Sequence, residues 1–229
     1  MNATNNNPES GVSPFVMKDC ALIAIAINKR ATTLKEFRDH IEILGHDSLY
    51  HHFWANLLLP RFEEREYLND FAGWVRHSLH DAKLAEQLAV LDPTSFNDLE
   101  ELRYHLLEYI DARLEENEYL QWARASQRFD FIRSEIVVFD THKRVESAQE
   151  LAELIPRMSV SSIFYHFIDA RRRAEDKADD FRHWLAFFGE TYQPLIARLG
   201  SIDPYFLSLV ELRRQLADTF QAYFAEPMP

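Results

Sequence analysis

Two histidines and two aspartates recur at corresponding places in this chain, and these residue types could support metal binding or proton transfer. His52 and His166 each follow an apolar residue by three positions and precede a phenylalanine, which places both imidazoles on the inward face of a predicted helix. Asp70 and Asp180 are the paired carboxylates of a later helix. Imidazole and carboxylate together suit a divalent metal, and imidazole alone suits proton transfer. His52 and His166 are therefore candidate catalytic residues, and all four are candidate metal ligands.

Both residue types also have a structural interpretation. A buried histidine commonly hydrogen-bonds a neighbouring cap or carbonyl and fixes the packing of helices. An aspartate at a helix start caps free backbone amides more often than it binds a metal. Asp169, one turn beyond His166, is a further carboxylate that a metal could use. The cofactor is left open: either there is none, or these residues hold a divalent metal.

Aromatic and basic residues near the paired histidines are candidates for binding a sugar or another flat ligand. Aromatic rings present flat apolar faces, and arginine binds carboxylates or phosphates. The same rings could instead fill a helical core, and the arginines could form interhelical ion pairs with nearby glutamates. The candidate ligand-binding residues are Tyr50, His51, His52, Trp74, Tyr165, His166, Trp184, Arg103 and Arg213.

These candidates occupy corresponding places because the chain aligns with itself. The stretch from Phe15 to Phe53 aligns without a gap with that from Phe129 to Phe167, an offset of 114 residues, and it contains more identical pairs than chance predicts. The match resumes at an offset of 110 residues, where D-F-x-x-W occurs in both copies. We call residues paired in this alignment matched positions. The alignment predicts a mainly α protein of two tandem repeats, each of about four helices, related by a pseudo-twofold axis.

The repeat also sets the predicted domain boundaries. A polar, Asn-rich start predicts a disordered tail over residues 1–14, followed by a first repeat unit over 15–114. A second repeat unit is expected over 129–226. The connector over 115–128 contains neither Gly nor Pro, so it is expected to be packed and not a loose linker.

Helix starts are predicted at matched places. Thr33 and Ser147 each stand three residues before a glutamate, which is the spacing of a capping box, so helices should begin near them. Ser48 and Ser162 are predicted N-caps of the next helix. The helix after that should be capped at one of two neighbouring residues in each copy, namely Asn69 or Asp70, and Asp179 or Asp180.

Two short stretches fit either a helix or a strand. Residues 20–27 alternate Ile with Ala, and residues 135–139 are rich in β-branched side chains. We favour a helix for the first stretch and leave the second open. One short strand per repeat is the alternative, and two such strands could pair across the pseudo-twofold axis.

Composition excludes several classes of function. The net charge of −12, from 25 Lys and Arg against 37 Asp and Glu, argues against nucleic acid as a partner. The longest apolar run, Cys20 to Ile27, is shorter than the ~20 residues of a membrane span, and no secretion signal is recognised. A single cysteine excludes an internal disulfide, so we expect a cytoplasmic protein without membrane partners. Phosphate-binding loops and hydrolase motifs are absent from the sequence.

Five short motifs resemble those of a known family. They stand here as Phe129-Asp130-Phe131, Thr33-Leu34-Lys35-Glu36-Phe37, Ser48-Leu49-Tyr50-His51-His52, Asn69-Asp70-Phe71-Ala72-Gly73-Trp74 and Glu101-Leu102-Arg103. The chain resembles domain of unknown function 5752, in two tandem copies, from Phe15 to about Phe224. Because members of that family look to be fused to, or encoded with, sugar-transfer enzymes, the resemblance implies carbohydrate metabolism and a glycosyltransferase or related enzyme as partner. It implies no catalytic mechanism.

Two functions follow as expectations. The first is a cytoplasmic ligand-binding or protein-interaction module of unknown specificity, associated with carbohydrate metabolism. The alternative is a metal-assisted enzyme that acts on a sugar or sugar phosphate through the paired His and Asp residues. Convergence of the four side chains in one solvent-connected pocket would favour the enzyme, whereas separate core contacts would favour the binding module. Whether the protein is an enzyme, and its oligomeric state, stay open.

Overall fold

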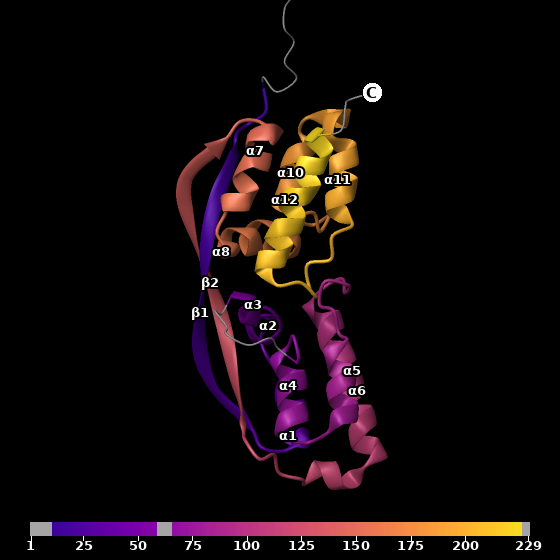
Figure 1. The fold of residues 1–229 in the computed structure, drawn as a ribbon. Coiled ribbons are helices and arrows are strands. Elements are labelled where there is room, and N and C mark those ends of the chain that lie inside the picture. The colour runs from indigo at the N-terminus through magenta and orange to yellow at the C-terminus, as the bar shows by residue number, and fades with distance from the viewer. Residues whose placement is uncertain (1–10, 59–65, 226–229) are drawn as a thin grey trace, which may run out of the picture. The chain divides into compact units, whose positions relative to one another are not determined.

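The computed structural model describes residues 11–58 and 66–225, so most of the predicted disordered tail lies outside the described residues. Figure 1 shows the helices and strands. In chain order they are β1 (Phe15–Ala31), α1 (Leu34–Glu42), α2 (His46–Tyr50), π-helix η1 (His51–Ala55), α3 (Asn56–Leu58), α4 (Asp70–His77), α5 (Ala82–Ala89), α6 (Leu99–Glu116), 3-10 helix η2 (Glu118–Gln121), β2 (Phe129–Val145), α7 (Ala148–Leu154), 3-10 helix η3 (Ile155–Arg157), α8 (Val160–Ile163), π-helix η4 (Phe164–Asp169), α9 (Ala170–Arg173), α10 (Asp180–Ala186), 3-10 helix η5 (Gly189–Tyr192), α11 (Gln193–Gly200) and α12 (Leu209–Ala225).

Two long strands show that the prediction of a mainly α protein of tandem helical repeats was wrong. β1 and β2 contain 17 residues each and pair in a two-stranded antiparallel sheet, so the fold combines helices with a sheet. Residues 20–27 and 135–139 lie inside these strands, which rules out the helix that we favoured for the first stretch. Alternation of Ile with Ala has the period of two that a half-buried strand requires, and pairing with the partner strand outweighs the helix propensity of alanine.

Each strand contains one residue in the left-handed region of backbone conformation. These residues are Asn28, with φ of 57°, and His142, with φ of 60°, and they are matched positions. Asn and His are among the non-glycine residues that adopt this conformation most readily. The two strands therefore deviate locally from regular extended geometry at corresponding places.

The chain forms two compact units that do not follow one another in sequence. The central unit comprises Leu22–Ile136, and the discontinuous unit comprises Met1–Ala21 together with Val137–Pro229. We call the first residues of each strand its opening. The two openings are exchanged between the units, because the start of β1 packs with the helices that follow β2, and the start of β2 packs with the helices that follow β1. In the predicted tandem repeats, the opening of each strand would pack with the helices that follow that strand in the sequence.

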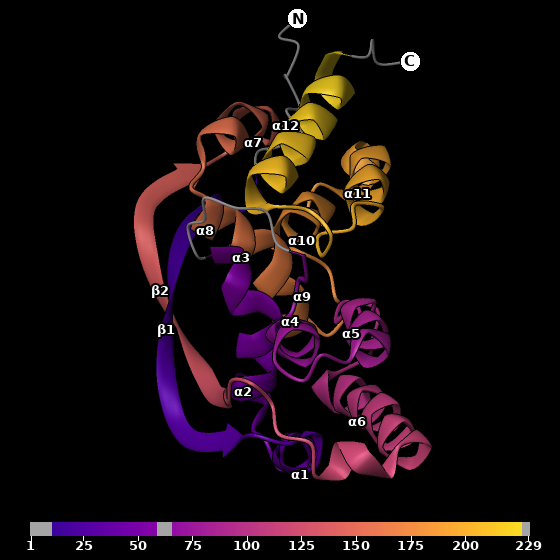
Figure 2. The same ribbon diagram turned by 60° about the horizontal axis from the view of Figure 1, so that its bottom comes forward.

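Phenylalanines from the start of β2 complete the core of the central unit. The ring of Phe37, on α1, lies 5.2 Å from that of Phe129 and 5.7 Å from that of Phe131. It also stacks on Trp74 of α4 at 4.8 Å. Around this cluster α4 packs on α5, and α1 packs on α6 (Figure 2). Phe129 and Phe131 are 6% and 1% exposed, so these two rings of β2 help to bury the apolar faces of the helices of this unit.

Phe15, at the start of β1, has the corresponding role in the discontinuous unit. Its ring lies 4.8 Å from His166, 5.5 Å from Phe181 and 5.6 Å from Trp184. The Trp184 indole N–H donates to the Ser13 carbonyl at 2.9 Å. The residues just before and at the start of β1 are thus fastened to α10.

The helix starts predicted at Thr33 and Ser147 are confirmed. Thr33 Oγ1 accepts the Glu36 N–H at 3.1 Å, and Ser147 Oγ accepts the Glu150 N–H at 3.1 Å, at the starts of α1 and α7. In the part of the chain that the structure describes, no helix has the length and apolarity that crossing a membrane requires.

Candidate functional site

Ser48 and His52 hold the backbone of one residue of β2. The two side chains are four residues apart on the continuous helix formed by α2 and η1, so they lie on the same face. Ser48 Oγ donates to the Ile132 carbonyl at 2.6 Å, and the Ile132 N–H donates to His52 Nε2 at 3.2 Å. His52 Nδ1 lies 3.1 Å from Asp70 Oδ2. We call Ser48, His52 and Asp70 the central clasp.

The matched residues make the same contacts in the discontinuous unit. Ser162 Oγ donates to the Lys18 carbonyl at 2.7 Å, and the Lys18 N–H donates to His166 Nε2 at 2.9 Å. His166 Nδ1 lies 2.7 Å from Asp180 Oδ2. These three residues form the second clasp. Ser48 and Ser162 were predicted as N-caps, and that prediction was wrong because their hydroxyls bind strand carbonyls while Gly45 and Ser159 occupy the N-cap positions.

The clasps fix the protonation of both histidines. A ring nitrogen that accepts a backbone N–H carries no proton, so the proton of each neutral imidazole resides on Nδ1 and is donated to the aspartate. A metal-bound histidine also donates a hydrogen bond from its unligated nitrogen, but here a backbone N–H occupies the Nε2 lone pair that a metal would use. His52 and His166, 1% and 2% exposed, therefore each hold a strand through Nε2 and an aspartate through Nδ1. The structure brings each to its own aspartate, within separate units.

The two aspartates stay ionised. Burial alone would raise the pKa of Asp70 and of Asp180, but hydrogen bonds outweigh it, from His52 and Asn56 to Asp70 and from His166 and Arg173 to Asp180, so both pKa values lie below the usual range. The residues before them cap the helices: Asn69 Oδ1 accepts the Ala72 N–H at 2.9 Å, and Asp179 caps α10.

His51, a buried side chain beside the central clasp, also contacts β2. Its Nδ1 lies 2.5 Å from Ser134 Oγ. One ligand atom each from His51, His52 and Asp70 lie within 4.8 Å of one another, a grouping that could hold a metal ion. Burial, and then the neighbouring His52, lower the pKa of His51 to about 4. His51 is therefore neutral at pH 7.

Lowering the pH should lower the unfolding free energy of the protein through protonation of His51. Because its pKa is near 4 in the folded protein and near 6.5 when exposed, its contribution to stability is complete above about pH 6.5 and is lost as the pH falls towards 4. The shift corresponds to a loss of roughly 3 kcal/mol of unfolding free energy. Urea unfolding at several pH values checks this expectation. His51→Tyr, which installs the residue of matched position Tyr165, should flatten the dependence, and an unchanged slope in this variant would contradict the assignment.

The other predicted ligand-binding aromatics lie in the core. Trp74 is 7% exposed, and its indole N–H donates to the Gln127 carbonyl at 2.7 Å. Trp184, Tyr50 and Tyr165 are 5–6% exposed. Tyr50 stacks on Trp54 at 4.9 Å. These rings offer little surface on which a sugar could stack.

Both predicted arginines bind the carbonyl ends of helices. Arg103 Nη1 donates to the Ile41 carbonyl, near the end of α1, at 2.7 Å. Arg213 Nη1 donates to the Met158 carbonyl, just after η3, at 2.8 Å. Arg103 also pairs with Glu100, at 2.9 Å, within α6, so this ion pair is not interhelical.

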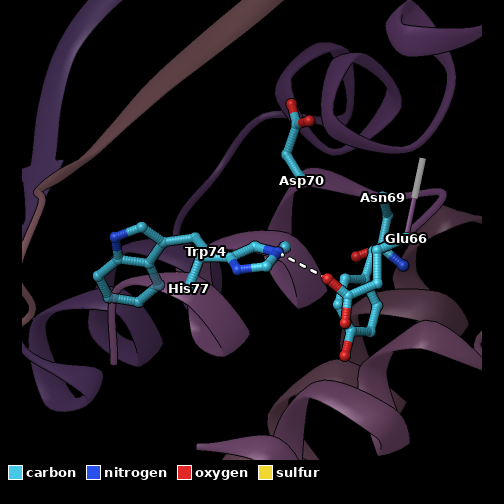
Figure 3. A pocket seen from close by; sticks show the side chains of 7 residues that line it. Glu66, Asn69, Asp70, Trp74 and His77 are labelled. Carbon is cyan, nitrogen blue, oxygen red and sulfur yellow. Dashed lines mark ion pairs between the residues drawn. The ribbon is translucent and has the colours of Figure 1, made fainter. Parts of the chain in front are cut away.

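A surface pocket of about 320 Å³ lies beside α4 in the central unit (Figure 3). Asp70 connects it to the central clasp. A Cβ added to Gly73 would meet no atom within 4 Å, so this glycine leaves the pocket open on one helical face, where the matched position has His183. The lining among the described residues is Glu66, Tyr67, Asn69, Asp70, Gly73, Trp74 and His77.

Sequence reasoning did not single out Glu66, Tyr67 or Gly73. Glu66 and Tyr67 follow a stretch that has no matched counterpart, so the self-alignment could not select them. Gly73 did give a signal, because a glycine inside a helix costs about 1 kcal/mol relative to alanine and usually has a packing or functional reason.

The fold and the clasps together define a class: an α/β protein in which serine and histidine on a π-bulged helix bind the backbone of a strand. The chain belongs to the family of unknown function DUF5752, which matches residues 12–221. The match is one copy spanning the chain, so the two tandem copies that the resemblance suggested are not supported.

A solved structure has the same fold. The structure of OrfY from Thermoproteus tenax matches with a TM-score of 0.78 and 23% sequence identity, covering 92% of this chain and 95% of that one. At this identity the likeness concerns the fold alone. No curated protein matches the chain.

Proposed function

We propose that this protein is a ligand-binding module and that the pocket beside α4 holds its ligand. The observation that carries the proposal is the opening at Gly73 next to the ionised Asp70. A pocket with a few polar groups and neighbouring rings is the usual form of a small-molecule site. At the matched position of α10 the chain has His183, so the missing side chain is particular to the central unit.

The alternative of a metal-assisted enzyme has one supporting observation, the grouping of His51, His52 and Asp70. Against it, metal binding at His52 Nδ1 would displace the proton that Nδ1 carries while Nε2 accepts the Ile132 N–H. A metal would therefore have to compete with the contact that holds β2. We favour the binding module for this reason.

Added zinc should leave the protein unchanged. Because metal binding would require the central clasp to rearrange, we expect less than a 1 °C rise in the melting temperature with equimolar Zn²⁺, and no metal in protein purified without chelators. Differential scanning fluorimetry and elemental analysis provide the measurements. Stoichiometric metal that is lost in His51→Ala would support the enzyme.

The carbohydrate association implied by the family resemblance is a separate proposal. A neutral sugar fits the hydrogen-bonding groups of the pocket, whereas a sugar phosphate would meet the carboxylates of Glu66 and Asp70. A glycosyltransferase as partner, and the cytoplasm as location, remain part of the proposal.

Filling the pocket should abolish binding without unfolding the protein. Gly73→Leu adds a side chain where the pocket is empty, and leucine favours a helix over glycine by about 0.8 kcal/mol. We expect at least a tenfold loss of affinity for any ligand in a panel of glucose, inorganic phosphate, methylguanidinium and methylammonium, measured by NMR titration. Gly73→Ala, which adds only a methyl group, is the control. A ligand that binds Gly73→Leu as tightly as the native protein would show that this pocket is not the site.

A further inference from the structure

In the discontinuous unit, the carboxylate of the second clasp has a cationic partner. Arg173 Nη2 lies 3.1 Å from Asp180 Oδ2. The guanidinium carbon of the same arginine lies 4.2 Å from the centre of the Tyr165 ring, and its Nε pairs with Asp169 at 2.9 Å. The carboxylate of the second clasp thus binds a guanidinium that is also held over an aromatic face.

The matched carboxylate, Asp70, has neutral partners. Its Oδ2 faces His52, which is neutral while its Nε2 accepts a backbone N–H, and its Oδ1 accepts from the Asn56 amide. Among residues 11–58 and 66–225, no lysine or arginine pairs with Asp70. The Asp70 side chain is 33% exposed. Its negative charge is therefore open to a ligand.

The second carboxylate of the pocket is already balanced. Glu66 lies 3.0 Å from His77 Nε2 and 3.8 Å from Arg76 Nε. Figure 3 shows the Asp70 carboxylate pointing away from the His77–Glu66 pair. Tyr67 contributes a ring that stays a neutral phenol, because burial and then Glu66 raise its pKa. Among the described residues that line the pocket, Asp70 is therefore the carboxylate without an ion pair to a lysine or arginine.

We infer that the pocket beside α4 binds a small organic cation carrying a guanidinium or primary ammonium group, with Asp70 as the counter-ion. The inference rests on the proposed function and specifies its ligand class. Arg173 shows within the same chain how such a group binds the carboxylate of a clasp. A cation in the pocket would give Asp70 the partner that Asp180 already has.

Titration of the full chain with methylguanidinium, methylammonium, glucose and inorganic phosphate tests this inference by ¹H–¹⁵N NMR. We expect the two cations alone to give saturable shifts in the amides of Asp70–His77. Asp70→Asn, which keeps the shape of the side chain, should weaken them at least tenfold. Asp180→Asn is the matched control and should leave the affinity unchanged. Gly73→Leu, which leaves Asp70 and the clasp in place, should also abolish the shifts.

The outcomes separate the inference from the proposed function. Glucose or phosphate binding that Gly73→Leu abolishes, without cation binding, would overturn the cation but keep the pocket. Equal cation affinity in the native protein and in Asp70→Asn would overturn the role of Asp70. If no probe causes shifts that depend on Gly73, both the inference and the pocket as binding site fail.

Discussion

Phe131→Ala is expected to lower the unfolding free energy by about 3–5 kcal/mol, the usual cost of removing a buried phenylalanine ring. The ring is 1% exposed and lies 4.8 Å from Phe129 and 5.7 Å from Phe37. Because β2 begins inside the central unit, backbone amides in α1 and α4 should lose protection from hydrogen exchange. Amides in the helices that follow β2 should keep it. Guanidinium unfolding and hydrogen–deuterium exchange measure the two effects.

Met17→Ala is the matched control for the exchange of strand openings. Met17 is 3% exposed at the start of β1, so we expect a loss of about 2–5 kcal/mol. Its effect on hydrogen exchange should fall on α8 and α10, which belong to the discontinuous unit. Protection lost from α8 and α10 in Phe131→Ala, or from α1 and α4 in Met17→Ala, would contradict the exchange.

His52→Leu should lower the unfolding free energy by about 3–5 kcal/mol. The variant removes two hydrogen bonds, each contributing about 1 kcal/mol, and leaves the Ile132 N–H and part of Asp70 without a partner, which costs a further 1–3 kcal/mol. Urea unfolding provides the measurement. His52→Gln can place an oxygen near the position of Nε2 and should recover part of the loss.

His166→Leu should have a loss of similar size, because the second clasp makes the same contacts with Lys18 and Asp180. A loss below 1 kcal/mol in both leucine variants would show that the histidines do not hold the strands.

The self-alignment located the clasps before their role could be known. It selected Ser48, His52 and Asp70 with their matched positions, and capping rules placed the starts of α1, α4, α7 and α10. The partners of the serines and histidines could not be read from the sequence, because each binds a backbone group about 80 to 150 residues away. A serine near a helix start has the same local pattern whether its hydroxyl caps the helix or binds a strand.

The exchange of strand openings could not be predicted from local sequence patterns, for a related reason. Phe15 and Phe129 are identical, so the alignment cannot say which set of helices each one joins. That choice depends on the antiparallel pairing of β1 with β2, a long-range feature of the whole chain. The pocket was missed because it depends on Gly73 and Glu66, at positions where the two copies differ.

The tautomeric state of His52 and His166 tests most directly whether these residues are strand clasps. Long-range ¹H–¹⁵N NMR at pH 7 distinguishes a ring nitrogen that carries a proton from one that accepts a hydrogen bond. We predict a protonated Nδ1 and an unprotonated, hydrogen-bonded Nε2 on both rings, with no change on adding Zn²⁺. A proton on Nε2, or a zinc-dependent shift of either ring, would contradict the clasps and return these histidines to the metal site.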